Sequence, residues 1–362
     1  MRLAHLWLTD FRNYGSADVE LAGEGLTVIT GDNGMGKTNL LEAVGWLATL
    51  ESFRGAPPEA MVRQGAVNAV VRAEGQRDDR RVLIEGELNP GGRTRVQVNR
   101  QVLRRARDLL GAVRVSVFAP DDLALVKAGP ALRRRYLDDL LVACHVRWDQ
   151  LQADVDRTLR QRATLLKQAG GRLSPEVAGT LDVWDAKLAD SGTALADGRR
   201  ELAEQLAPFV SDAYDALAGA PARVSLTYAA EWQPPRGPGL AVALAAARAA
   251  DVRRGVSTVG PHRDDLVLSI DGRSARTHAS QGEQRSLALA LRLGGHAVVT
   301  TAAGSPPVLL LDDVFSELDP SRTAALVSSL PEGQALLSTA GPPPPGMKPA
   351  TVVQVKDGMV VG

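Results

Sequence analysis

The chain has 362 residues, and its 42 basic and 42 acidic side chains give a formal net charge of zero. This length exceeds one ordinary hydrophobic core, and a hydrophobic content of 44% predicts a globular protein with two lobes or domains. With zero net charge, electrostatic steering of the whole molecule toward nucleic acid is weak, so contact with a polyanion requires a local excess of basic residues.

The sequence has no run of about 20 uninterrupted apolar residues, which a membrane-spanning helix requires. Its N-terminus lacks the basic and then apolar pattern of a secretion signal. The single cysteine, Cys144, excludes an intramolecular disulfide framework and a cysteine-cluster metal site, and we expect it in the core. These features predict a soluble protein of the cytoplasm.

Residues 2–30 alternate in the manner of strands, and the buried strand predicted at 26–30 leads into a glycine-rich loop. The loop has the G-x-x-x-x-G-K-[ST] spacing of a phosphate-binding loop, and its residues are Gly31, Asp32, Asn33, Gly34, Met35, Gly36, Lys37 and Thr38. We expect its backbone N–H groups to surround phosphate oxygens, Lys37 to reach the β and γ phosphates of ATP, and Thr38 to hold Mg²⁺. The helix predicted at 38–50, which includes Asn39, directs the positive end of its dipole at the phosphates. A flexible glycine-rich turn is the alternative interpretation.

Residues 66–100 have the pattern of an antiparallel meander, with strands predicted at 67–73, 81–88 and 94–98 and a turn at 89–92. We expect this sheet to pack beside the nucleotide core. The most basic stretch of the sequence, which we call the arginine tract, consists of Arg93, Arg95, Arg100, Arg104, Arg105 and Arg107. Two interpretations remain open: the tract faces a DNA phosphate backbone, or it is a solvated strand edge whose charge prevents aggregation.

A strand is predicted at 114–118, and the pattern is helical from 132 to about 218, with breaks at 170–171, 174–175 and Pro208. Several short helices are therefore expected, and no heptad pattern persists long enough for a long coiled coil. A strand at 223–229, a flexible return at 233–239 and a helix at 241–253 follow. We assign residues 131–255 to a mainly helical insertion domain, and residues 1–130 and 256–362 to a nucleotide-binding head. In the next turn, His262 and Arg263 either contact DNA or a partner lobe, or lie in a turn that Asp264 stabilises.

The segment Ser280-Gln281-Gly282-Glu283-Gln284-Arg285 precedes an apolar helix predicted at 286–299. A hydroxyl and a glycine at a helix start form an anion-binding end, and one phosphate-binding loop does not need a second such end for its own phosphates. We therefore predict that Ser280 and Gly282 bind the nucleotide of another subunit. Ordinary capping of the helix by Ser280 is the alternative.

An apolar strand is predicted at 308–311, and two carboxylates, Asp312 and Asp313, follow it. Such a strand delivers its acids to the sheet edge where ligands bind. We predict that Asp312 holds hydrated Mg²⁺, directly or through water, and that Asp313 orients or deprotonates the attacking water. Together with Lys37 these are the predicted catalytic residues, and an acidic turn after a core strand is the alternative. Residues 316–320 are expected to cap the next helix, either at a subunit boundary or as an ordinary helix cap.

The order of phosphate-binding loop, Ser-Gln-Gly-Glu-Gln segment, Leu-Leu-Leu-Asp-Asp strand and Ser-Glu-Leu-Asp loop resembles the ABC-type ATPase head of the SMC class. Within that class the chain resembles the RecF family of recombination mediators. The narrower resemblance rests on Phe11-Arg12-Asn13-Tyr14, on Pro120-Asp121-Asp122-Leu123, on the stretch from Gly129 to Asp138 and on Gly260-Pro261-His262-Arg263-Asp264-Asp265-Leu266. It implies an α/β fold: an ABC-type ATPase head, with a mixed sheet and an antiparallel β subdomain, plus a mainly helical second domain.

The resemblance implies ATP-driven head-to-tail dimerisation, in which Ser280 and Gly282 of one subunit close over the ATP of the other until hydrolysis reopens the dimer. By the same resemblance, residues 11–14 lie along the ribose or the phosphates, and Arg12 is the best candidate among them for this contact. A strand end between the lobes is the alternative. The resemblance also implies binding to duplex DNA near single-strand gaps with RecR, and, indirectly with RecO, help in loading RecA. Asp313 stands where the broader class has Glu, and this shorter carboxylate predicts slow ATP turnover. The usual switch histidine is replaced near Ser338 and Thr339.

Other functions also use a phosphate-binding loop. The first alternative is the ATP-hydrolysing subunit of a transporter or of another SMC-type complex, and the second is a phosphoryl-transferring enzyme such as a kinase. A kinase needs no segment like Ser280–Gly282 acting on a second subunit. The RecF-like segments and the missing switch histidine argue against a transporter. A glutamine loop is expected at Gln64 or at the Pro120 turn.

Overall fold

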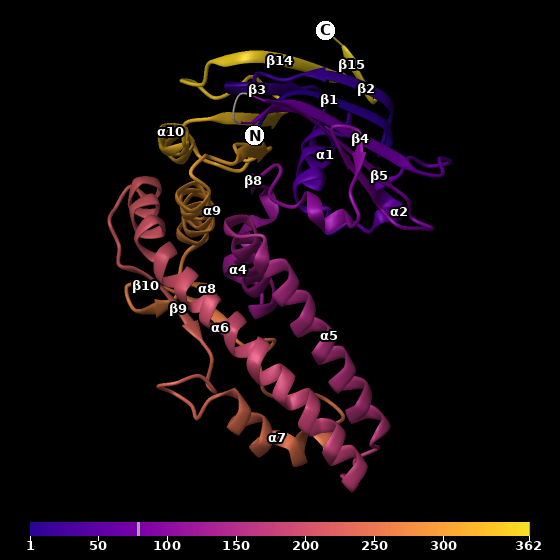
Figure 1. Ribbon diagram of the computed structural model, residues 1–362. Coiled ribbons are helices and arrows are strands. Elements are labelled where there is room, and N and C mark those ends of the chain that lie inside the picture. The colour runs from indigo at the N-terminus through magenta and orange to yellow at the C-terminus, as the bar shows by residue number, and fades with distance from the viewer. Residues whose placement is uncertain (78–79, 362) are drawn as a thin grey trace. The chain divides into compact units, whose positions relative to one another are not determined.

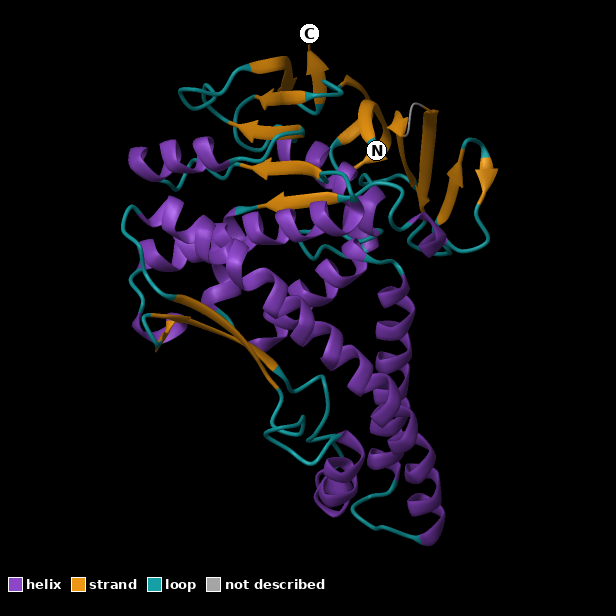
Figure 2. Ribbon diagram, turned by 60° about the vertical axis from the view of Figure 1, so that its left-hand side comes forward, coloured by secondary structure: helices purple, strands orange, loops and turns teal. Residues whose placement is uncertain are grey.

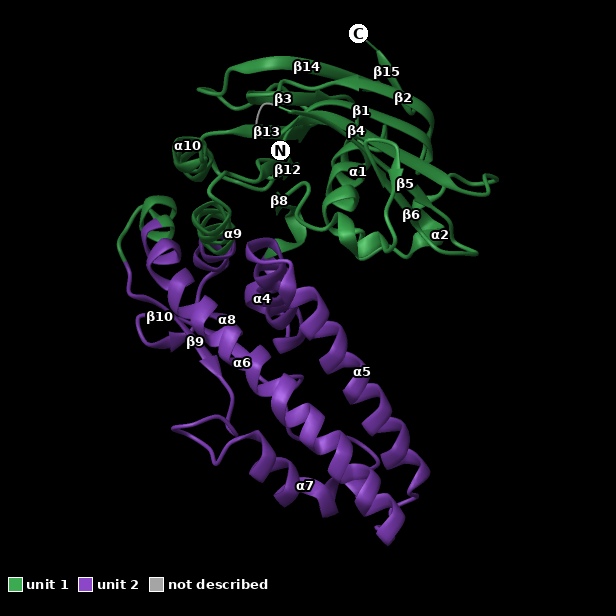
Figure 3. Cartoon of the chain, in the orientation of Figure 1, with its two compact units in different colours: residues 1–122, 213–221, 289–362 green, residues 123–212, 222–288 purple. Residues whose placement is uncertain are grey.

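The chain divides into two compact units in a computed structural model that describes residues 1–77 and 80–361. Unit 1 comprises residues 1–122, 213–221 and 289–362, and unit 2 comprises residues 123–212 and 222–288 (Figure 3). Each unit therefore combines segments that are far apart in the sequence, as the colours of Figure 1 show. The predicted domain boundaries stay a prediction, because compactness alone does not define a functional domain; residues 256–288 of the predicted head fall in unit 2.

Unit 1 contains a six-stranded mixed sheet in the order β15-β14-β3-β13-β12-β8 (Figure 2). Its strands are β3 (Gly25–Thr30), β8 (Val115–Phe118), β12 (Val308–Asp312), β13 (Gln334–Thr339), β14 (Pro349–Lys356) and β15 (Met359–Val361). All but β15 run parallel, and every residue of β12 is buried, which explains its uninterrupted apolar sequence. The carboxyl ends of β3, β12 and β13 consequently lie at one edge of the sheet.

The second sheet of unit 1 is antiparallel, with six strands in the order β2-β1-β4-β5-β6-β7. These are β1 (Arg2–Phe11), β2 (Tyr14–Glu20), β4 (Ala69–Arg77), β5 (Arg80–Leu88), β6 (Arg95–Val98) and β7 (Gln101–Val102). The predicted meander is confirmed. One face of this sheet is apolar because alternate residues of β1 and β4 are buried.

Helix α1 (Lys37–Thr49) shares one hydrophobic core with both sheets of unit 1. Trp46 on this helix packs against the backbone of β5, where a Cβ on Gly86 would stand 2.6 Å from the indole ring. The same core includes Leu310 of β12 and Leu336 of β13. The helix that follows the phosphate-binding loop is thereby fixed between the two sheets, and the predicted α/β class is confirmed.

Unit 2 is mainly helical. It contains α3 (Ala124–Lys127), α4 (Pro130–Cys144), α5 (Arg147–Gln168), α7 (Leu240–Arg254), α8 (Ala275–His278) and most of α6 (Pro175–Ala218). A small antiparallel sheet of β9 (Val224–Ala229), β10 (Asp265–Ile270) and β11 (Arg273–Ser274) completes it. Cys144 is buried, as predicted.

The prediction of several short helices in this region was wrong. The break at 170–175 is real, but α6 continues for 44 residues through Pro208. Leu202, Leu206 and Val210, spaced four residues apart, are all buried, whereas Pro208 is exposed. The apolar stripe thus passes the proline without interruption, and packing overrides the local preference against proline in a helix.

Four of the remaining elements are short. They are the helices α2 (Pro58–Met61) and α10 (Pro320–Ser329) and the 3₁₀ turns η1 (Ala106–Leu109) and η2 (Pro120–Leu123). The long helix, α9 (Gln281–Ala303), contributes residues to both units. Within the described part of the chain, α9 is the one helix whose length and composition would allow it to cross a membrane, but most of its apolar window is buried in the protein, as in a core helix.

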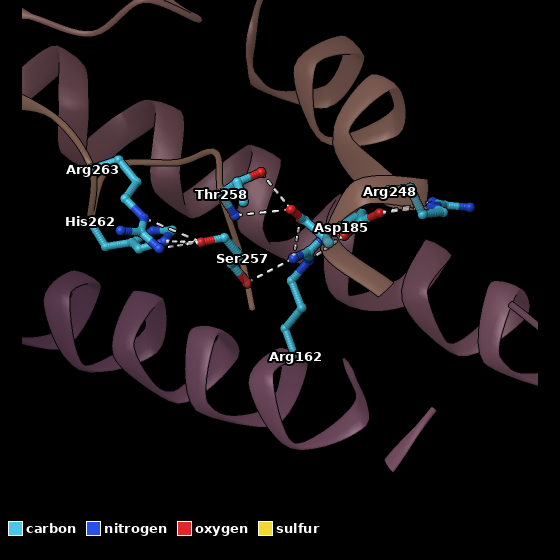
Figure 4. Close-up of polar contacts among 8 residues, drawn as sticks. Arg162, Asp185, Arg248, Ser257, Thr258, His262 and Arg263 are labelled. Atoms are coloured by element: carbon cyan, nitrogen blue, oxygen red, sulfur yellow. Dashed lines mark hydrogen bonds and ion pairs between the residues drawn. The ribbon is translucent and has the colours of Figure 1, made fainter. Parts of the chain in front are cut away.

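A buried ionic cluster joins three helices of unit 2 (Figure 4). Arg162 on α5 has no exposed side-chain surface, and its Nε lies 2.8 Å from Asp185 Oδ1 on α6. Its Nη1 donates to Asp251 Oδ2 on α7 at 2.8 Å and to Ser257 Oγ at 2.7 Å. Arg248 adds a second cation, 2.8 Å from Asp185 Oδ2. These contacts fix the chain after α7 to the helices.

Candidate functional site

The phosphate-binding loop connects β3 to α1 in a backbone conformation that requires glycine. The φ angles of Gly31, Gly34 and Gly36 are 150°, 84° and 114°. A Cβ on Gly31 would stand 2.2 Å from the Val355 carbonyl oxygen, and one on Gly36 would stand 2.6 Å from Asn13 Nδ2. Gly36 precedes α1 and provides no side-chain cap, so the first N–H groups of the helix remain available for an anion.

Asn13, which precedes β2, and Tyr14, its first residue, support this loop through hydrogen bonds. Asn13 Nδ2 donates to the Met35 carbonyl at 2.9 Å, and the Tyr14 hydroxyl donates to the Gly36 carbonyl at 3.1 Å. Burial raises the pKa of Tyr14, which keeps the donating proton on this hydroxyl. Asn39 Nδ2 in turn donates to Asn13 Oδ1 at 2.8 Å. The sequence singled out 11–14 as a family segment, but its role as a support of the loop required the structure.

Lys37 folds back over the loop from the first turn of α1. Its Nζ donates to the carbonyl oxygens of Gly31 at 2.7 Å and Asp32 at 2.9 Å. The side chain is largely buried, whereas Asp32, Asn33 and Gly34 are exposed. The ammonium group is therefore held within the curve of the loop, where a cation attracts phosphate.

The structure brings Thr38 and Asp312 together across 274 positions of sequence. Thr38 Oγ1 donates to Asp312 Oδ1 at 2.7 Å, and Ser338 Oγ at the end of β13 donates to the same oxygen at 2.7 Å. Asp313 follows with a φ of 48°, and its N–H points to Ser338, 3.1 Å from the hydroxyl and 3.2 Å from the carbonyl. A hydroxyl and a carboxylate are hard oxygen donors, which is the ligand chemistry of Mg²⁺. Thr38 and Asp312 thus fit the predicted metal.

Arg12 lies near the loop but is engaged with α1. Its Nε and Nη2 bind both carboxylate oxygens of Glu42, at 2.7 and 2.6 Å, and its Nη1 donates to the Ala60 carbonyl. Glu42 is fully buried, and a buried carboxylate needs a cationic partner, which the Arg12 guanidinium provides. Contact of Arg12 with a nucleotide stays a prediction.

Ser280 and Glu283 form a reciprocal cap at the start of α9. The Glu283 N–H donates to Ser280 Oγ at 3.3 Å, and the Ser280 N–H donates to Glu283 Oε2 at 2.7 Å. Hydrogen bonds from Ser280 lower the pKa of the Glu283 carboxyl. Ser280 is exposed and Gly282 lies in the first turn. Capping is therefore one role of Ser280, and action on a second subunit stays a prediction.

The Gly260–Asp265 segment is occupied by contacts within unit 2. His262 Nε2 and Arg263 Nη2 both contact the Ser257 carbonyl, at 3.1 and 2.9 Å (Figure 4). The Asp264 carboxylate accepts from the Tyr228 hydroxyl and the Trp232 indole, so it ties this turn to distant residues. The sequence could not identify these partners because they lie more than 30 residues away.

Known proteins match this chain over most of its length. The chain matches the RecF/RecN/SMC N terminal domain family over residues 2–337. It is 47% identical to the DNA replication and repair protein RecF of Frankia alni, over 94% of this chain and 93% of that protein. It is 43% identical to the protein of the same description from Streptomyces avermitilis, over 99% of both chains.

Solved structures give the same result for the fold. A structure described as the recombination mediator protein RecF-ATP in the RecFOR pathway is 28% identical and has a TM-score of 0.91, covering 99% of this chain and 97% of that one. An Smc head bound to the C-winged helix domain of ScpA is 16% identical, with a TM-score of 0.57, covering 99% and 96%. The second likeness concerns the fold alone. Together with the RecF-ATP structure and the family match over residues 2–337, it confirms the predicted fold class, an α/β head of the SMC type.

Proposed function

Because this chain belongs to the RecF family of the RecF/RecN/SMC proteins, we propose that it is an ATP-dependent DNA-binding protein of recombinational repair. The observation that carries the proposal is the hydrogen bond from Thr38 to Asp312, since it joins a phosphate-binding loop to an acidic strand end. The ATP of the RecF-ATP structure supports ATP as the nucleotide.

The residues of the loop perform separate tasks in this proposal. The N–H groups at the start of α1 and the Lys37 ammonium bind the phosphates, and Thr38 and Asp312 hold the metal. Mg²⁺ supplies positive charge that stabilises the transferring phosphoryl group. Asp313 orients or deprotonates the attacking water. A carboxylate one methylene shorter than Glu reaches less far, so hydrolysis is slow.

Hydrolysis of ATP controls association in this proposal. Ser280 and Gly282 of one subunit close over the nucleotide bound to Gly31–Thr38 of the other, in a head-to-tail homodimer. A hydrogen bond to a charged group contributes about 1.5 to 3 kcal/mol, so a few such bonds per nucleotide convert a weak dimer into a populated one. Loss of the γ phosphate removes these bonds and reopens the dimer.

DNA and other repair proteins are the proposed partners. The dimer binds duplex DNA near single-strand gaps together with RecR, and it assists RecA loading indirectly with RecO. The solved relative, a recombination mediator of the RecFOR pathway, supports this assignment. A protein that acts on chromosomal DNA in this way works in the cytoplasm.

The mass of the protein in solution tests the proposal. Asp313→Asn should bind ATP and barely hydrolyse it, and we expect a dimer with ATP but a monomer with ADP or without nucleotide. Ser280→Arg in the same background should bind ATP and stay monomeric. The arginine side chain is much larger than that of serine, so it prevents the helix start from closing over the partner's nucleotide. An ATP-bound monomer of Asp313→Asn, or an ATP-dependent dimer of the double variant, would contradict closure by Ser280.

A further inference from the structure

One buried hydroxyl contacts both acidic residues of the site. Ser338 lies at the end of β13 with 1% of its surface exposed, directly opposite Asp312 in the parallel register of β12 and β13. Its Oγ donates to Asp312 Oδ1 at 2.7 Å. Because a serine hydroxyl has one proton, this donation commits the group to the carboxylate.

The same serine also fixes the residue after Asp312. The Asp313 N–H lies 3.1 Å from Ser338 Oγ and 3.2 Å from the Ser338 carbonyl oxygen, so that both acceptors share it. Asp313 has a φ of 48°, a left-handed conformation that residues other than glycine rarely adopt. The contacts with Ser338 therefore hold the chain in the turn that sets the direction of the Asp313 side chain.

The Asp312 carboxylate is held through one of its oxygens. Oδ1 accepts from two hydroxyls, those of Thr38 and Ser338, which arrive from different elements. Both hydroxyls bind Oδ1 and not Oδ2. Two donors on one oxygen restrict rotation of the carboxylate and leave the second oxygen to face a metal or its bound water. Residues that hydrogen-bond to a metal ligand in this way orient it and tune the affinity of the site for the metal.

We propose that Ser338 is a positioning residue for Mg²⁺ binding and for hydrolysis: it orients Asp312 toward the metal and holds Asp313 in place for the attacking water. The inference rests on the proposed function of the site and adds a residue to it. One hydroxyl thus couples the carboxylate that retains the metal to the carboxylate that acts on water.

Three substitutions separate hydrogen bonding from packing. Ser338→Ala removes the donor, Ser338→Cys keeps nearly the size of the side chain with a weak donor, and Ser338→Thr keeps the hydroxyl. The measurements are ATP binding as a function of free Mg²⁺, ATP binding without Mg²⁺, and kcat separately from KM. Ser329→Ala is the control, because Ser329 Oγ donates within α10 to the Ala325 carbonyl and does not contact either acid.

We expect the Ala and Cys variants to need about 10- to 100-fold more Mg²⁺ for half-maximal ATP binding and to lose kcat by a similar factor, as substitutions behind a metal ligand do. ATP binding without Mg²⁺ should not change in either variant. Ser338→Thr should keep both values near those of wild type, because it retains the donating hydroxyl.

Two results would overturn the inference. The first is an unchanged Mg²⁺ requirement in the Ala variant. The second is wild-type behaviour of the Cys variant, since the size of the side chain alone would then suffice. A wild-type protein that binds no ATP would instead refute the proposed function, so the two failures are distinguishable.

Discussion

The Lys37 ammonium is held by two carbonyl oxygens of its own loop, so its charge is already placed where phosphates would bind. We expect Lys37→Met to weaken ATP binding by at least about tenfold, since each charge-assisted hydrogen bond contributes about 1.5 to 3 kcal/mol. Titration with a fluorescent ATP analogue measures the affinity. Lys348→Met, which removes an exposed lysine, is the control and should bind normally. Equal affinities would show that Lys37 only closes the loop.

His296 on α9 is buried, and this burial affects its protonation. Its Nδ1 lies 3.1 Å from Ser116 Oγ, and burial lowers its pKa to about 4, below the ordinary value of 6.5. Between these two pH values the unfolded chain binds a proton that the folded protein does not. Stability should therefore fall as the pH decreases from 6.5 to 4, by a total of about 3 kcal/mol from this residue.

Chemical denaturation at about pH 7.5 and about pH 4.5, on either side of the unfolded-state pKa, tests this prediction. His296→Gln cannot gain the proton, so the loss of unfolding free energy on acidification should be smaller in this variant than in wild type. His278→Gln changes an exposed histidine and provides the matched control. The same acid sensitivity in all three proteins would contradict the assigned role of His296.

At the scale of whole elements, the buried Arg162 cluster determines how α5, α6 and α7 pack. Asp251→Ala would leave Arg162 without one of its two carboxylates and remove the acceptor of the Thr258 N–H. Loss of one partner of a buried ion pair costs about 3 to 5 kcal/mol. Denaturant unfolding of the whole chain measures this loss. Asp154→Ala breaks the exposed pair with Arg157 and should cost less than about 1 kcal/mol; equal losses would contradict the argument.

Elements defined by local pattern were predictable, and those that depend on distant packing were not. The strand, glycine loop and helix around Lys37 follow from sequence order, and so does the buried strand that ends at Asp312. The length of α6 could not be predicted in this way. Burial of apolar residues on both sides of Pro208 outweighs the tendency of proline to end a helix. The contact of Ser338 with Asp312 depends on the register of β12 and β13, and the sequence does not specify that register.

At the scale of the whole molecule, zero net charge makes DNA binding depend on where the basic residues gather. The arginine tract runs along β6, β7 and η1, the outer strands and the following turn of the antiparallel sheet in unit 1. Arg95, Arg100 and Arg104 are exposed there. Arg100 also has a φ of 66°, in the turn between the two strands, so its side chain is displayed at a tight hairpin end.

Salt dependence distinguishes a DNA contact from a charged edge that only prevents aggregation. Each phosphate that a protein neutralises adds about 0.9 to the slope of log affinity against log salt. Replacing Arg95, Arg100 and Arg104 by Gln should therefore lower the slope by about 2 to 3 and weaken binding of all duplex sequences alike. The control replaces three exposed arginines of unit 2, Arg236, Arg253 and Arg254. If both triple variants keep the wild-type slope, the arginine tract does not contact the DNA backbone. Its arginines then protect the open edge of the sheet, where their charge prevents pairing with a strand of another chain.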